Sequence, residues 1–248
     1  MQRIASGFGS LKIEFIVIMK VNIIKYTVLA LGLGYASLDG LMAQSAIDSN
    51  YVFSGYTDRM SVFNKMPVSS KSIIFLGDSL TEAGRWRDIA PEYPLLNRGI
   101  SGDISFGVYA RLNEILRHHP QKIFLMIGVN DLKRKIPTSY IIRNYERIVA
   151  KIRKEFPKTK IYLNSILPVN NTKLIESFKS VKNSDIEQLN EGLKQISRYN
   201  KNVQFVDLHK IFADQNGELR AEVTPDGIHL EVSAYVEMIN YLKQIKAL

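Results

Sequence analysis

Short apolar runs alternate with longer amphipathic segments along most of this chain. Strand-like runs, short and continuously apolar as in strands buried on both faces, lie at residues 72–76, 95–96, 123–127, 160–166 and 203–206. Helix-like segments, with apolar residues every three to four positions, lie at residues 51–66, 104–118, 139–156, 184–198 and 232–245. A polar stretch at 170–183 is expected to be a loop with a short helix. This alternation predicts an α/β fold with a parallel sheet of about five strands and helices on both faces.

The N-terminal 43 residues have the pattern of an extension followed by a secretory signal peptide. A positively charged region precedes an uncharged stretch at 26–38, and Ala43 offers a small residue at the expected cleavage site. The uncharged stretch is shorter than the roughly 20 apolar residues that a membrane span needs. We therefore expect a secreted or periplasmic protein with no stable membrane anchor, in which residues 44–248 form a single domain. The alternative is a buried N-terminal helix, which the glycines of this segment disfavour. Two start positions remain open, Met1 and Met19.

The composition fits a folded domain and excludes some chemistry. An apolar fraction of 46% over 248 residues is ample for a core. The formal net charge of +9 is spread over the chain without the interleaved aromatic residues of a single-stranded nucleic-acid surface, so no nucleic-acid partner is expected. The chain has no cysteine, which excludes disulfides, thiolate metal sites and cysteine nucleophiles.

Candidate catalytic residues follow the predicted strands. Ser79, Gly99 and Asn130 each come shortly after one strand, and Asp226 and His229 come after a long segment that follows the last strand. In open parallel sheets, ligands bind beyond the carboxyl ends of the strands. These residues can therefore meet at one edge of the sheet.

The residue types suit nucleophilic catalysis. A serine hydroxyl needs an adjacent base, for which His229 is suitable near neutral pH. Asp226, three residues earlier, could fix the histidine tautomer. The N–H groups of Ser79 and Gly99 and the side-chain amide of Asn130 could stabilise an oxyanion. Gly99 lacks a Cβ, which would allow the backbone to approach the substrate closely.

Each motif alone is ordinary turn or cap chemistry, but together and in this order they resemble a known family. Gly-Asp-Ser-Leu, Asn-Arg-Gly-Ile-Ser-Gly-Asp, Gly-Val-Asn-Asp and Asp-Gly-Ile-His-Leu are similar to the four blocks of the GDSL or SGNH hydrolase superfamily, over about residues 70–245. The resemblance implies a flavodoxin-like three-layer α/β/α sandwich and a serine esterase that uses no metal or cofactor. The resemblance matches Ser79 to the nucleophile and Gly99 and Asn130 to the oxyanion donors. It matches Asp226 to the acid and His229 to the base.

Within that superfamily, the chain looks most like platelet-activating-factor acetylhydrolase-like proteins and bacterial carbohydrate or sialate O-acetylesterases. The resemblance implies hydrolysis of short acyl esters, acetyl esters above all, on a small molecule or a glycan. A thioesterase or lysophospholipase acting on longer chains is one alternative, and a non-catalytic glycan-binding module on the same fold is another. A nucleotide-binding protein is disfavoured, because no Walker or Gly-x-Gly-x-x-Gly pattern follows the first strand.

Other residues have less specific interpretations. Trp86 could line the site or pack in the core, and His118 is expected to cap helix carbonyls rather than bind a metal. Four apolar residues are expected to flank the site and to shape an acyl pocket: Ile100, Leu132, Val169 and Ile228.

Overall fold

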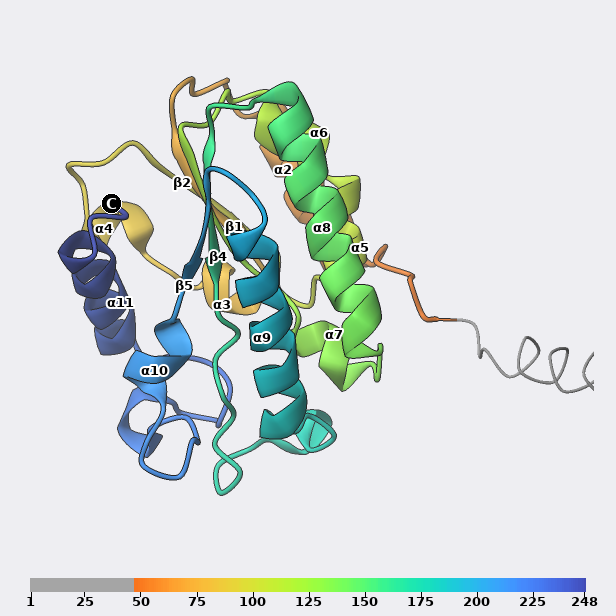
Figure 1. The fold of residues 1–248 in the computed structure, drawn as a ribbon, viewed down its shortest axis with the longest axis vertical. Helices are drawn as coiled ribbons and strands as arrows, with labels where there is room; N and C mark the ends of the chain where they lie inside the picture. The colour runs from red at the N-terminus through yellow and green to blue at the C-terminus, as the bar shows by residue number, and fades with distance from the viewer. Residues whose placement is uncertain (1–46) are drawn as a thin grey trace, which may run out of the picture. The chain divides into compact units, whose positions relative to one another are not determined.

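Five parallel strands form one sheet in the computed structural model, which describes residues 47–248. The strands are β1 (Ile73–Gly77), β2 (Leu95–Gly99), β3 (Lys122–Met126), β4 (Lys160–Asn164) and β5 (Val203–Val206). Their spatial order is β2-β1-β3-β4-β5, and every neighbouring pair is parallel (Figure 1). The predicted α/β class with a five-stranded parallel sheet is confirmed.

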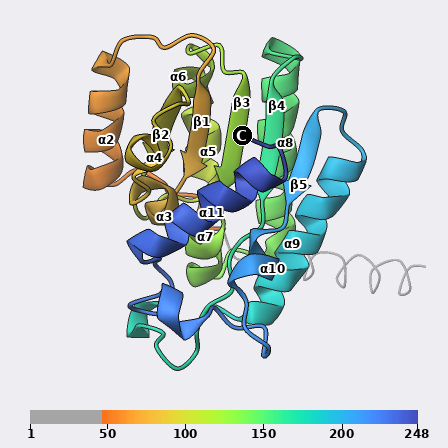
Figure 2. The ribbon, with the colours of Figure 1, turned by 90° about the vertical axis from the view of Figure 1, so that its left-hand side faces the viewer.

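Helices cover both faces of this sheet. Those of the described residues are α2 (Ser54–Lys65), α3 (Ser79–Glu82), α4 (Trp86–Ile89), α5 (Ser105–Ala110), α6 (Leu112–Leu116), α7 (Val129–Lys133), α8 (Thr138–Glu155), α9 (Asn183–Arg198), α10 (Leu208–Phe212) and α11 (Val232–Gln244), with 3-10 helices at Glu176–Phe178 and Ala221–Val223. In Figures 1 and 2, α5, α6, α8 and α9 lie on one face, while α4 and α11 lie on the other. The arrangement is the three-layer sandwich that the sequence predicts.

A row of stacked aromatic rings crosses the sheet on the α11 side. Phe75 of β1 stacks on Phe124 of β3 at 4.9 Å, and Phe124 stacks on Tyr162 of β4 at 4.5 Å between ring centroids. Trp86 continues the row, because its ring lies parallel to Phe75 at 4.0 Å, and Tyr235 of α11 contacts it edge-on. Trp86 is therefore a core residue, which excludes the other interpretation of this side chain as a wall of the site.

Two elements differ from the sequence prediction. The strand expected at 95–96 extends to Gly99, because its polar residue Arg98 is buried against Glu114 instead of facing solvent. The single helix expected at 104–118 is two helices, α5 and α6, separated at Arg111. There the Arg111 side chain turns inward and is buried completely in an ion pair with Asp103.

The predictions for residues 1–43 fall outside the described residues and remain predictions. Residues 48–248 form one compact unit. Within the described part of the chain, no helix has both the length and the apolar character needed to cross a membrane.

Candidate active site

Ser79 lies directly beyond the carboxyl end of β1, as the first residue of α3. The turn requires a glycine at position 77, because a Cβ there would lie 2.2 Å from the Met126 carbonyl oxygen. The Asp78 side chain caps α3 by accepting the Leu80 N–H at 3.1 Å. The Ser79 N–H has no acceptor among residues 47–248. The turn therefore leaves an unpaired N–H next to the serine hydroxyl.

A continuous chain of hydrogen bonds joins Ser79 to two residues near the C-terminus. Ser79 Oγ lies 3.1 Å from His229 Nε2, and His229 Nδ1 lies 2.6 Å from Asp226 Oδ2. The other carboxylate oxygen accepts the backbone N–H groups of His229 at 2.8 Å and Ile228 at 3.0 Å. Because an ionised carboxylate only accepts, it favours the histidine tautomer with its proton on Nδ1, which leaves Nε2 free to accept the serine proton.

The hydrogen bonds to Asp226 also keep this carboxyl ionised. Its partial burial acts to raise the pKa, but the hydrogen bonds from the His229 ring and from two backbone N–H groups outweigh burial. The pKa of Asp226 consequently lies below its usual value, as a carboxylate that stabilises an imidazolium requires.

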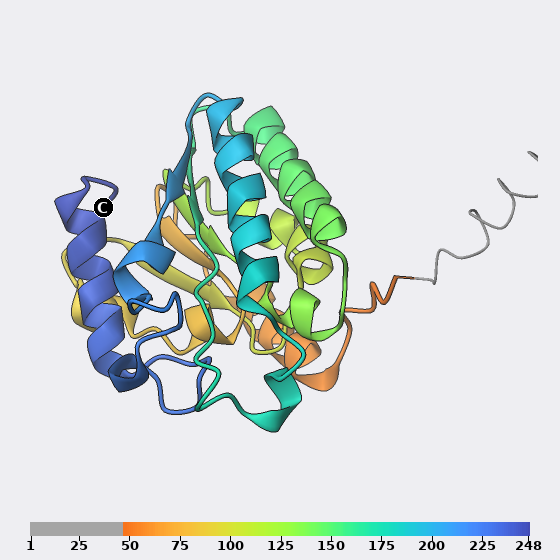
Figure 3. The same cartoon turned by 60° about the horizontal axis from the view of Figure 1, so that its bottom comes forward.

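The loop after β4 holds the segment that carries Asp226 and His229. The Asn170 N–H donates to the Gly227 carbonyl at 3.0 Å, and the Asn170 side chain donates to the Leu219 carbonyl at 2.7 Å. Gly227 has a φ of +83°, and a Cβ there would lie 2.7 Å from the Asn170 carbonyl oxygen. Asn170 is not among the residues predicted for the site, although its position shortly after a strand is the same signal that singled out Asn130. Figure 3 brings this edge of the sheet forward.

Asn130 lies beyond β3 in the first turn of α7. Gly128, with a φ of +144°, makes the sharp turn that precedes it. The Asn130 side chain is buried, and its Nδ2 donates to the Asp103 carbonyl at 3.1 Å. A primary amide has two hydrogens, so one remains for a second acceptor.

The structure gives Gly99 a different role from the predicted one. Its N–H donates to Asn97 Oδ1 at 2.9 Å, and its carbonyl accepts from Arg59 Nη2 at 3.2 Å. A Cβ at Gly99 would lie 2.1 Å from the backbone nitrogen of Glu82. The glycine is thus required for close packing of α3 on β2, and its N–H is not available to an oxyanion.

Gly102, three residues later, has an N–H without an acceptor among the described residues. Its neighbour Ser101 donates its N–H to Glu82 at the end of α3 at 2.5 Å, and its other neighbour Asp103 accepts from Asn130. Gly102 therefore lies between α3, which begins with Ser79, and Asn130. Its φ of +81° favours glycine, and the second glycine of the Asn-Arg-Gly-Ile-Ser-Gly-Asp motif was the signal available in the sequence.

Three buried carboxyl groups surround the turns that carry Ser79 and Asn130. Burial raises the pKa of Asp78 and of Asp131 to about 7 and that of Asp103 to about 6. Asp103 is paired with the buried Arg111 at 2.9 Å, and Asp131 accepts the N–H and the hydroxyl of Ser105. Protons therefore bind to this cluster close to neutral pH.

The remaining candidate residues are structural. His118 is buried and does not cap a helix: its Nδ1 accepts the Ser69 N–H at 2.9 Å, and its Nε2 lies 3.2 Å from Glu114 Oε1. Residues 47–248 contain no cluster of three or more histidine, cysteine or acidic side chains placed to hold a metal ion. The four apolar residues expected to flank the site are all buried, namely Ile100, Leu132, Val169 and Ile228.

Comparison with known proteins identifies relatives of most of this chain. Residues 75–236 match the family model described as GDSL-like Lipase/Acylhydrolase family. An arylesterase of Vibrio mimicus is 29% identical over 97 residues, which are 39% of this chain and 46% of the arylesterase. The chain therefore matches about half the length of this curated relative.

Solved structures share the fold over a larger part of the chain. A Streptococcus pneumoniae protein described as a platelet activating factor is 27% identical, with a TM-score of 0.67 over 87% of this chain and 98% of its own. An acetylxylan esterase of Geobacillus stearothermophilus is 19% identical, with a TM-score of 0.54 over 72% of this chain and 95% of its own. The second likeness shows the fold alone.

Proposed function

Because this chain belongs to the GDSL-like lipase/acylhydrolase family, we propose that it is a serine esterase that hydrolyses carboxylic esters through an acyl-enzyme. The observation that carries the proposal is the hydrogen-bonded chain from Ser79 through His229 to Asp226. In this arrangement Ser79 is the nucleophile, His229 the general base and Asp226 the group that orients and stabilises the histidine.

Acylation begins when Ser79 Oγ attacks the ester carbonyl carbon and His229 Nε2 takes the hydroxyl proton. The resulting oxyanion needs donors that are already in place. The Ser79 N–H and the second amide hydrogen of Asn130 have no other acceptor among the described residues. We assign the third donor to the Gly102 N–H instead of Gly99, because the Gly99 N–H already binds Asn97.

Collapse of the tetrahedral intermediate breaks the bond to the leaving alcohol. His229 returns its proton to the leaving oxygen, and the acyl group stays on Ser79 Oγ. Water then attacks the acyl carbon while His229 takes a proton from it, and release of the acid restores the serine hydroxyl.

We further propose that the substrate is a short-chain, acetyl-sized acyl ester of a small molecule or glycan. Three of the four apolar residues expected to shape the acyl pocket, Ile100, Val169 and Ile228, are at most 3% exposed and therefore offer little surface to a long acyl chain. The signal-peptide pattern of residues 1–43 supports secretion, which N-terminal sequencing of protein from culture medium or periplasm would test.

The decisive test of the mechanism is Ser79→Ala. We expect kcat for p-nitrophenyl acetate to fall roughly 10⁴–10⁶-fold, because no other group replaces the nucleophile. A fluorophosphonate probe should modify the wild-type protein at Ser79, as mapped by peptide mass spectrometry. The control is Ser233→Ala, at an exposed position of α11, which should keep full turnover and labelling.

Near-normal turnover of Ser79→Ala would refute the assigned nucleophile. Folded wild-type protein with neither labelling nor turnover would refute the esterase proposal. A series of p-nitrophenyl esters tests the acyl size, and faster turnover of octanoate than of acetate would contradict the short-chain proposal.

A further inference from the structure

Helix α2 packs on the loop that carries Gly102, although α2 lies before the residues that match the family model. Tyr56 and Phe63 of α2 form an apolar cluster with Ile100 at the start of this loop. The Phe53 ring, just before α2, is so close to Gly102 that a Cβ there would lie 3.5 Å from it. The packing therefore connects this N-terminal helix with the loop that we assign to oxyanion binding.

Arg59 of α2 makes the polar part of this connection. Its Nη2 donates to the Gly99 carbonyl at 3.2 Å, and its Nε lies 3.1 Å from Glu82 Oε1. The other carboxylate oxygen of Glu82 accepts the Ser101 N–H at 2.5 Å and the Ser101 hydroxyl at 2.6 Å. Arg59 thus contacts one end of the loop directly and the next residues through Glu82.

The position of Glu82 links these contacts to the nucleophile. Glu82 is the last residue of α3, and Ser79 is the first. A loop held by Glu82 is therefore held against the same short helix that carries the reacting hydroxyl. The planar guanidinium can donate to the Gly99 carbonyl and at the same time lie against the Glu82 carboxylate as an ion pair, which a single ammonium does less well.

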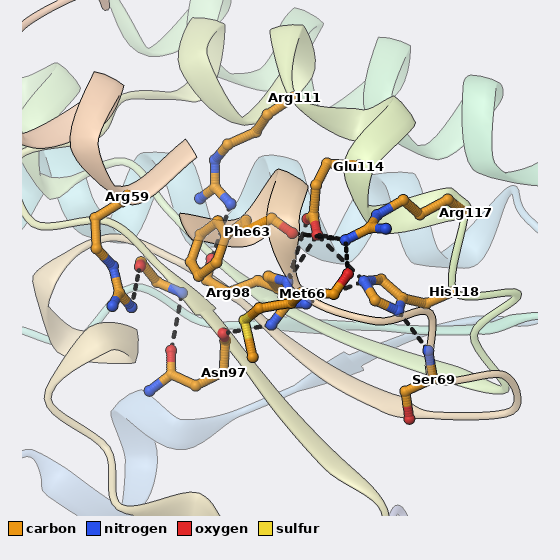
Figure 4. A network of polar contacts seen from close by, with 11 residues as sticks. Arg59, Phe63, Met66, Ser69, Asn97, Arg98, Arg111, Glu114, Arg117 and His118 are labelled. Carbon is orange, nitrogen blue, oxygen red and sulfur yellow. Dashed lines mark hydrogen bonds and ion pairs between the residues drawn. The ribbon is translucent and has the colours of Figure 1, made fainter. Parts of the chain in front are cut away.

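The environment of Arg59 favours an orienting role over a stabilising one. The side chains of Arg59 and Glu82 are 34% and 27% exposed, and partly exposed ion pairs contribute little to stability. The Phe63 ring lies 4.8 Å from the Arg59 guanidinium and 4.6 Å from that of Arg98, so it restricts both (Figure 4). The Arg59 side chain is therefore held in place but adds little to the stability of the fold, which suits a residue that positions the loop 99–103.

We propose that Arg59 is a positioning residue, which together with Glu82 holds the loop 99–103 so that the Gly102 N–H is aligned with the oxyanion formed on Ser79. This proposal rests on the esterase function proposed above. Misplacing a catalytic group by about 1 Å lowers rates by up to about 100-fold. Loss of Arg59 should therefore slow the chemical step more than it weakens substrate binding.

The test compares Arg59→Gln with Arg117→Gln, a matched arginine that directly follows α6 and binds the C-terminal end of α2. Arg117 is 28% exposed and donates to the Phe63 and Met66 carbonyls, at 2.6 and 2.9 Å, but does not contact the loop 99–103 (Figure 4). Both variants therefore loosen α2, and only Arg59→Gln releases the loop.

For Arg59→Gln we expect kcat for p-nitrophenyl acetate to fall about 10- to 100-fold with KM within about twofold of wild type. Fluorophosphonate should label Ser79 more slowly by a similar factor, and amide hydrogen exchange in residues 99–103 should be faster. Arg59→Lys, which keeps the charge opposite Glu82, should recover part of kcat. Arg117→Gln should keep wild-type kcat, and its exchange should increase only near residues 63–69.

Two results would overturn the positioning role in an active enzyme: Arg59→Gln with wild-type kcat, or Arg117→Gln with the same loss of kcat as Arg59→Gln. The second result would mean that α2 docking, and not Arg59, controls the site. If the wild-type protein shows no labelling and no turnover, the esterase function fails, and the positioning role fails with it. Wild-type activity measured in parallel therefore separates the two failures.

Discussion

The buried carboxyl groups beside the nucleophile make the stability of this protein depend on pH. Asp131 is completely buried, and burial raises its pKa from 3.8 to about 7. In the unfolded chain the same carboxyl ionises near its ordinary pKa. The folded state therefore binds a proton that the unfolded state has already released, and stability falls as the pH rises from about 4 to about 7.

Asp131→Asn should remove this loss of stability. The asparagine has the same shape and can still accept the Ser105 N–H, but it carries no charge that burial could penalise. Near pH 4 the melting temperatures of variant and wild type should be similar. Above pH 7 the variant should be more stable, by on the order of 4 kcal/mol at most.

Thermal unfolding of both proteins from pH 4 to pH 9 measures this difference. Asp226→Asn is the control, because the pKa of Asp226 is lowered and not raised, so its replacement should not increase stability at neutral pH. A constant difference between Asp131→Asn and wild type across the whole range would contradict a buried, titrating Asp131.

The sequence identified residues that the fold brings together, but it did not show which backbone groups are free. Ser79, Asp226 and His229 lie in one hydrogen-bonded chain, as expected from the position of Ser79 after β1 and from the long segment that brings Asp226 and His229 back from β5. Gly99 and Gly102 are both glycines of the same motif, and spacing alone cannot distinguish them. The distinction depends on the Asn97 side chain, which folds back onto the Gly99 N–H.

At the scale of elements, buried polar residues account for the errors in the predicted boundaries. Continuous apolar runs predicted β1, β3, β4 and β5 to within two residues at each end. In β2 the apolar run stops at Leu96, but Asn97 and Arg98 continue the strand because their side chains have partners inside the protein. Hydrophobic patterning does not detect such residues, since their partners are distant in the sequence.

Arg111 shows how strongly such a residue can determine an element. Between α5 and α6, its guanidinium donates to the Gly77 and Arg98 carbonyls, each at 2.9 Å, and pairs with Asp103. Arg111→Met would remove the cation paired with the buried Asp103 carboxylate and one donor from each of the Gly77 and Arg98 carbonyls. We expect the free energy of unfolding to fall by about 3–5 kcal/mol, as when one partner of a buried pair is removed.

Urea unfolding measures this effect, and the double variant Arg111→Met/Asp103→Asn provides the control. The double variant should recover part of the lost stability, because it also removes the unpaired charge. If Arg111→Met alone were within 1 kcal/mol of wild type, the ion pair would not be a stabilising contact.

At the scale of the whole molecule, the strand order determines how the catalytic chain is completed. Ser79 follows β1, whereas the segment with Asp226 and His229 follows β5 at the far edge of the sheet, three strand positions away. The chain must therefore return across the carboxyl edge before α11 begins. The sequence predicted that the return is possible, because the connecting segment is long, but it did not predict what holds that segment in place.

Asn170 is one of the residues that hold the returning segment, together with Lys173 and Ile175, and its loss should affect activity without direct contact with the substrate. Its backbone N–H binds the Gly227 carbonyl, and its side chain binds the Leu219 carbonyl and accepts from Thr172 and from the Lys173 N–H. In Asn170→Ala the buried Leu219 carbonyl loses its donor, and the loop after β4 loses its internal bonds. We expect His229 to be less well aligned with Ser79, and kcat for p-nitrophenyl acetate to fall about 10-fold.

The comparison variant is Asn171→Ala, the neighbouring residue whose side chain binds the half-buried Glu218 carboxylate and neither the Leu219 carbonyl nor residues 224–230. It should retain wild-type kcat. Amide hydrogen exchange in residues 224–230 should increase in Asn170→Ala and not in Asn171→Ala. The reason is that a misplaced His229 requires the segment that carries it to become less ordered. Wild-type kcat in both variants would show that the segment with Asp226 and His229 keeps its place through its own turn, independently of the loop after β4.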